Sequence, residues 1–335
     1  MPNSSPLQCE QGPKALFPVD PTTENRCMTS SVDNRRNLTV VGIDGSVSSR
    51  NALGWAAADA VGRNTTLLLV YAGVDRDIAR AGAANAHGGT ASGARARARS
   101  ALAAARVVAM SVLGDDADVE TVLEPGPPDE VLNEYADTAR MLVLGSRRKG
   151  SVARAVHGSV STDVVTHARC PVVVVPHGFT RATTVPDAAA AVVVGVNGSP
   201  KDDAVLAVAF DQASRLGVPL HAVHAYEATE PRAGFVRHID LGPRIRRSSA
   251  PKRWIERLVA SWSEKYPDVV VTTHAAHDRP SHALLENAFD TQLVVVGACS
   301  RGATSPLFVG STSRTVLRRA EVPVVFVPAN AGQPG

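Results

Sequence analysis

The chain has 335 residues, of which 44% are hydrophobic and 20% charged, and its formal net charge is +3. This length allows two domains of ordinary size, and the charge is too small to indicate a nucleic acid or an anionic membrane as main partner. The four cysteines form no CxxC pair, which indicates neither a zinc site nor a disulfide framework and favours a reducing compartment. No apolar run reaches the roughly 20 residues of a membrane helix, and the start lacks a signal-peptide core. We therefore expect a cytoplasmic protein.

Residues 1 to 36 are rich in Pro, Ser, Asn and Thr without an apolar period, so we expect a disordered extension, in which Met28 is an alternative start. The chain then repeats itself. Residues 39–46 match 192–199 at an offset of 153, and later landmarks match at 152: 141–146 with 293–298, 158–159 with 310–311, and 170–176 with 322–328. Matches over a whole domain length predict a duplication. The predicted domains are 37–177 (the first half) and 190–329 (the second half), with a linker at 178–189 and a tail at 330–335.

In each half, short apolar runs bounded by Gly, Pro and Asn alternate with longer amphipathic stretches, which is typical of buried strands between helices. The first half predicts strands near 38–43, 66–72, 118–123, 141–145 and 172–176, and helices near 48–62, 93–113, 128–138 and 159–168. The second predicts strands near 191–196, 219–225, 269–275, 293–297 and 324–328, and helices near 201–216, 251–266, 280–288 and 311–319. The predicted fold class is α/β, with two tandem doubly wound parallel sheets.

The first predicted strand ends in Asp44-Gly45-Ser46, at the carboxyl edge where open α/β sheets bind ligands. A carboxylate at this edge can accept hydrogen bonds from a sugar hydroxyl. Asp and Ser are also favoured helix caps, so capping of the next helix is the alternative explanation.

A second cluster combines a strand end, a glycine turn and a helix start, over residues 145–151 and 158–161. Glycines let the backbone approach a phosphate, and a helix N-terminus attracts anions. Arg147, Arg148 and Lys149 would add positive charge. The alternative is a capped helix after an ordinary basic loop.

These spacings resemble the ATP-binding signature of the universal stress protein family, which is Gly, two residues, Gly, nine residues, Gly and then Ser or Thr. The matching residues are Gly145, Arg148, Gly158 and Ser159 in the first half, and Gly297, Ser300, Gly310 and Ser311 in the second. Arg148 and Ser300 replace the second glycine, although a glycine follows two positions later in both halves. The resemblance covers roughly residues 38–176 and 190–329 and implies a Rossmann-like fold of the family's type.

The resemblance also implies a nucleotide site, holding ATP with or without magnesium. The family's aspartate at the end of the first strand is matched by Asp44, whereas the second half has Asn197, which carries no charge. By the same resemblance the backbone after Tyr71 and after His224 meets the adenine. The implied binding residues are Gly42, Asp44, Ala72, Gly126, Gly145, Arg148, Gly158, Ser159 and Val160. The weaker set in the second half is Gly195, Asn197, Ala225, Gly297, Ser300, Gly310, Ser311 and Thr312.

Three hypotheses about function follow. The first is a stress-response regulator whose ATP-dependent conformation is recognised by regulatory proteins. The second is a scaffold without nucleotide, which Arg148, Ser300 and Asn197 favour, and the third is a weak ATPase that uses Asp44. Because no GxSxG, GxxxxGK[ST] or HExxH motif occurs, we predict no catalytic residues and no metal site of the chain's own.

The resemblance further implies that strands 172–176 and 324–328 pair across a pseudo-twofold axis and join the two repeats, with a homodimer left open. Arg95, Arg97, Arg99 and Arg106 spread around one predicted helix without interleaved aromatics, so we expect a solvated surface and no nucleic-acid partner. His157 and His167 flank the candidate phosphate helix, but neither lies beside a credible nucleophile in the sequence.

Overall fold

The computed structural model describes residues 37–73, 91–146, 159–179, 190–226, 250–288, 291–298 and 310–329. The strands of the first half are β1 (Leu38–Gly42), β2 (Thr66–Ala72), β3 (Val119–Glu124), β4 (Met141–Gly145) and β5 (Val172–Val175). Those of the second are β6 (Ala191–Gly195), β7 (Leu220–Ala225), β8 (Val271–Ala276), β9 (Thr291–Gly297) and β10 (Val324–Val327).

The helices of the first half are α2 (Val47–Ala60), α4 (Ala91–Leu113), α5 (Pro128–Ala136) and α6 (Ser159–His167). Those of the second half are α7 (Asp202–Leu216), α8 (Ala250–Lys265), α9 (Pro280–Glu286) and α10 (Ser311–Arg319). Each boundary falls within two residues of the one predicted from the apolar pattern, and the α/β fold class is confirmed. Runs of valine such as β5, in which all four residues are buried, belong to strands covered on both faces.

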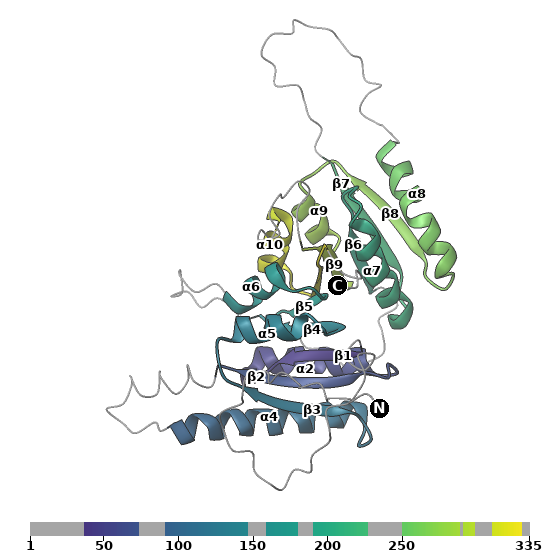
Figure 1. The fold of residues 1–335 in the computed structure, drawn as a ribbon. Coiled ribbons are helices and arrows are strands. Elements are labelled where there is room, and N and C mark those ends of the chain that lie inside the picture. The colour runs from purple at the N-terminus through teal and green to yellow at the C-terminus, as the bar shows by residue number, and fades with distance from the viewer. Residues whose placement is uncertain are drawn as a thin grey trace, which may run out of the picture.

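The strands form one sheet in the order β3-β2-β1-β4-β5-β10-β9-β6-β7-β8 (Figure 1). Strands within each half are parallel, and β5 pairs antiparallel with β10, with Val173 opposite Val325. This confirms the prediction that the terminal strands join the two repeats. Because the seam is antiparallel, the carboxyl edges of the two halves point in opposite directions.

Helices cover both faces of this sheet. One core layer unites side chains of α2, α4, α7 and α8, including Leu53, Leu102, Phe210 and Ile255, all buried. The layer on the opposite face is formed with α5, α6, α9 and α10. Both layers run across the seam, so the two halves share continuous apolar cores. No helix among the described residues is long and apolar enough to span a bilayer.

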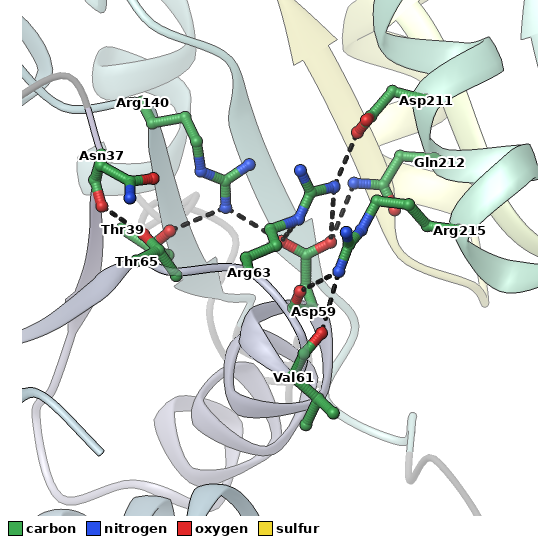
Figure 2. A network of polar contacts seen from close by, with 10 residues as sticks. All are labelled: Asn37, Thr39, Asp59, Val61, Arg63, Thr65, Arg140, Asp211, Gln212 and Arg215. Atoms are coloured by element: carbon green, nitrogen blue, oxygen red, sulfur yellow. Dashed lines mark hydrogen bonds and ion pairs between the residues drawn. The ribbon is translucent and has the colours of Figure 1, made fainter. Parts of the chain in front are cut away.

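A buried polar network joins the halves where α2 approaches α7 (Figure 2). At its centre is Asp59, which is 8% exposed and accepts hydrogen bonds from Arg140 at 3.0 Å and from Gln212 at 3.0 Å. Arg63 forms an ion pair with Asp59 at 3.4 Å and with Asp211 at 2.6 Å. Burial by itself raises the pKa of Asp59, but Arg63, Arg140 and the Gln212 amide outweigh it and hold that pKa below its ordinary value of 3.8.

Candidate functional site

The strand order of the first half reverses beside β1, which lies between β2 and β4. Asp44 follows β1 and Gly145 ends β4, so these two residues stand at the carboxyl ends of neighbouring strands. Open α/β sheets bind ligands in the crevice outside such a reversal. The structure therefore brings together two of the predicted site residues at the position where the fold favours a ligand.

The turn after β1 has a structural role of its own. Asp44 Oδ1 accepts a hydrogen bond from the Ser46 amide at 2.9 Å, and Ser46 Oγ accepts one from the Ser49 amide at 3.1 Å and caps α2. Gly45 has φ +76°, a left-handed conformation that favours glycine. The capping explanation is thus correct for Ser46. Asp44 is exposed, so its carboxylate is also accessible at the sheet edge.

Gly145 is required by packing. A Cβ at this position would overlap the backbone carbonyl of Ser48, because α2 passes directly over the end of β4. Gly42 and Gly195 also have packing roles, since a Cβ there would meet the side chains of Leu144 and Leu284 respectively. These glycines therefore fit the fold for reasons other than phosphate approach.

Of the remaining predicted residues of the first half, Ala72 and Gly126 lie at the same sheet edge, where Ala72 pairs with Glu124 at the ends of β2 and β3. Ala72 is half-buried at the end of β2, and Gly126, with φ +94°, lies in the turn before α5. Ser159 and Val160 begin α6, the helix whose N-terminus was predicted to face a phosphate. Arg148 and Gly158 lie outside the described residues, as does Ser300 of the second half.

Ser48, Asn51 and His177 form a contact at this edge that sequence reasoning missed. Ser48 Oγ lies 2.8 Å from His177 Nδ1, and Asn51 Nδ2 donates to the His177 carbonyl at 2.8 Å. These bonds tie α2 to the segment just after β5. The partners are more than 120 residues apart, so no local signal could have revealed them.

The corresponding turn in the second half is filled from within. The Asn197 side chain accepts from the Ser199 amide at 3.0 Å, which reproduces the Asp44 turn. In addition, the Asp202 carboxylate, 3% exposed, accepts from the amides of Asn197 at 3.1 Å and Gly198 at 2.7 Å. Burial raises the pKa of Asp202 above its ordinary value, although these amides oppose the shift. An internal carboxylate thus occupies the backbone donors of this turn.

The other predicted residues of the second half belong to strand ends and to the start of α10. Gly297 ends β9, and its carbonyl accepts from Ser313 Oγ at 2.7 Å. The Gly310 amide donates to Ala298 O at 3.2 Å. Ser311 and Thr312 open α10, and Ala225 is half-buried at the end of β7.

One group of possible metal ligands occurs among the described residues, formed by Asp278, His282 and Glu286 at α9. His282 Nδ1 is hydrogen-bonded to the Asp278 carboxylate, and this bond raises the pKa of His282 above 6.5. His282 and Glu286 are exposed, and exposed acidic groups are common without a bound metal. We therefore assign no metal to this group.

The arginines of α4 are all exposed, as predicted for a solvated surface. Arg106 Nε donates to the Val119 carbonyl at 3.3 Å and so fastens α4 to β3. Arg97 borders a cavity between α2 and α4. The prediction of a solvated surface is thus confirmed, although the spacing of charges along a helix did not reveal these two neighbours.

Comparison with known proteins places this geometry in context. The model described as "Universal stress protein family" matches residues 38–176 and 190–328. Universal stress protein Rv2005c of Mycobacterium tuberculosis is 37% identical over 298 residues, covering 88% of this chain and 98% of that protein. Universal stress protein Rv1996 of the same species is 35% identical over 308 residues, covering 85% and 93%. A crystal structure of a universal stress protein from Archaeoglobus fulgidus has a TM-score of 0.62 at 18% identity, covering 88% of this chain and 99% of its own.

Proposed function

The chain belongs to the universal stress protein family, and on this premise we propose that it is a cytoplasmic, ATP-binding stress regulator whose first half holds the nucleotide. The protein acts through the conformation that ATP stabilises and through contacts with regulatory proteins, not through turnover. A ligand shifts such an equilibrium only as far as its affinities for the two conformations differ.

The observation that carries the proposal is the position of Asp44 at the strand reversal, beside the end of β4. In the proposal the exposed carboxylate accepts a hydrogen bond from the ribose. The α6 N-terminus, which begins at Ser159 after the family's glycine spacing, attracts the phosphates through its free amides and dipole. Bound ATP would supply negative charge and a shape that partners can recognise.

The second half supports the scaffold hypothesis instead. Asp202 already occupies the amides of Asn197 and Gly198. Asn197 also lacks the negative charge with which Asp44 would accept a hydrogen bond from the ribose. We therefore expect one nucleotide per chain, with the second half contributing structure and protein contacts.

The test is to purify the full chain without added nucleotide, denature it, and count the released nucleotide by chromatography against protein concentration. We expect about one ATP per chain. If none is released, and titration with ATP and magnesium also detects no binding, the scaffold hypothesis holds for both halves. Two ATP per chain would contradict the role given to Asp202.

The sharpest variant is Asp44→Asn. Asn197 makes the same turn bond in the second half, so asparagine should preserve the turn and remove only the charge. We expect Asp44→Asn to bind ATP more weakly with an unchanged circular dichroism spectrum. Asn197→Ala is the matched control and should leave the nucleotide count unchanged. Phosphate release that falls in Asp44→Asn would instead favour the weak ATPase.

A further inference from the structure

A cavity of about 720 Å³ lies between α2 and α4 in the first half. Its lining includes Leu53 from α2, Ala101 and Ala105 from α4, and Tyr71 from β2. This volume lies within the range of small-molecule sites, which are mostly apolar with a few polar groups. Although Asp44 belongs to the lining, the cavity extends along the helices on one face of the sheet, away from α6, which covers the opposite face.

The cavity exists because α4 presents alanines to it. Ala101, Ala104 and Ala105 all belong to the lining, and an alanine side chain ends at Cβ. Ala101 stands next to the turn after β1, since a Cβ built on Gly45 would lie 3.5 Å from the Ala101 methyl. A larger residue at position 101 would therefore project into the part of the cavity nearest Asp44.

The second half has such larger residues at the corresponding positions. Trp254 precedes the buried Ile255 as Ala101 precedes the buried Leu102, at the offset of 153 that also relates His224 to Tyr71. The Trp254 ring lies 4.8 Å from the His224 ring, measured between centroids. A half-buried indole thus lies against this ring in the second half, where the first half has the methyl group of Ala101.

The polar groups of the cavity have a net positive charge. Arg50 and Arg97 contribute two guanidinium groups against the single carboxylate of Asp44. Arg50 Nη1 donates to the Gly45 carbonyl at 3.0 Å, which holds this guanidinium beside the turn. Guanidinium groups bind carboxylates and sulfonates through charge-assisted hydrogen bonds. We propose that the cavity between α2 and α4 is a second ligand site of the first half, for a small monoanion with a ring-sized apolar body.

The probe is 1-anilinonaphthalene-8-sulfonate, a sulfonate on an apolar ring system, titrated into the full chain and followed by fluorescence. We expect one saturable site per chain. Ala101→Trp should weaken binding by at least roughly tenfold, because it reproduces the closed second half. Ala103→Trp, at an exposed position of the same helix, is the matched control and should bind as the wild type does.

Two further variants keep the inference testable if Ala101→Trp unfolds. Arg97→Gln, at an exposed position, should raise the Kd of the probe roughly fivefold. Trp254→Ala should add no second site, because the positions of Arg50 and Arg97 are taken by Asp203 and Ala250 in the second half. Unchanged binding in both Ala101→Trp and Arg97→Gln would overturn the proposal and identify the probe as bound to scattered apolar surface.

The proposal of a nucleotide site and the proposal of a cavity site can be tested independently of each other. If the chain releases no ATP and Ala101→Trp still abolishes probe binding, the cavity site holds and the nucleotide proposal is wrong. If Ala101→Trp retains one ATP and also retains the probe, the nucleotide proposal holds and the cavity site is wrong.

Discussion

Replacing Asp59 with asparagine should destabilise the protein strongly. The side chain of Asp59 is 5% exposed and stands between the guanidinium groups of Arg63 and Arg140. The Nε atoms of both arginines are buried without a hydrogen-bond acceptor among the described residues, and Asp59 is the carboxylate that forms ion pairs with both guanidinium groups. Removing one member of a buried set of paired charges lowers the free energy of unfolding by about 3–5 kcal/mol, because the remaining charges stay desolvated.

Urea unfolding followed by circular dichroism measures this loss. With a dependence of about 3 kcal/mol per M urea, the midpoint should fall by about 1–1.7 M. Asp211→Asn is the matched control, because the Asp211 side chain is 41% exposed and pairs with Arg63 alone. We expect this variant to lower the free energy of unfolding by at most about 1 kcal/mol. Equal midpoints for the two variants would refute the reasoning.

Acid provides an independent test of the same network. The pKa of Asp59 is lowered in the folded state, so its contribution to stability is present above the ordinary value of 3.8 and is lost as the pH falls through the folded value. The stability difference between the wild type and Asp59→Asn should therefore be full at pH 7 and shrink below pH 3.8. A difference that stays constant down to pH 2 would exclude a charged Asp59 as its source.

Four further outcomes are expected. Gly145→Ala should lower the free energy of unfolding by about 1–3 kcal/mol, because its methyl group would overlap the Ser48 carbonyl; Gly54→Ala, which meets nothing within 4 Å, should raise it by about 0.5–1 kcal/mol in the same urea assay. Burial raises the pKa of Cys170 to about 12, so peptide mass mapping should find this thiol unalkylated by iodoacetamide at pH 8 until urea is added. An NMR titration should place the pKa of His282 above 6.5, owing to its bond with the carboxylate one turn earlier, and a value at or below 6.5 would contradict that bond.

Much of the fold was predictable because its signals are local. The valine runs of β5 and β6 are bounded by glycine and proline. Such runs can be recognised as strands without knowing which strands lie beside them. The repeat then predicted two similar halves, and the resemblance to the universal stress protein family predicted their pairing through β5 and β10. Asp44 was predicted as a site residue from local signals too, because it follows directly after the first apolar run.

The site's surroundings were not predictable, because they depend on residues distant in sequence. Gly145 looks like a phosphate-loop glycine until the carbonyl of Ser48 is found against it. The cavity follows from alanines of α4, which the sequence presents only as a favourable helix composition. The carboxylate of Asp202 looks like an ordinary helix-start acid, and only its burial against the amides of Asn197 and Gly198 shows that the turn is occupied.

The pairing of Asp59 with Gln212 has a consequence for assembly. The two residues are 153 apart, the offset that relates the first strands of the halves, so they are equivalent positions that meet across the seam. Two copies of the first half paired in the same manner would oppose one Asp59 carboxylate to another, and both would have to be desolvated. In the tandem chain, the Gln212 side-chain amide instead donates a hydrogen bond to the Asp59 carboxylate at 3.0 Å. The joined chain therefore favours association of unlike halves over self-association of the first, a preference that a dimer of identical single domains could not encode.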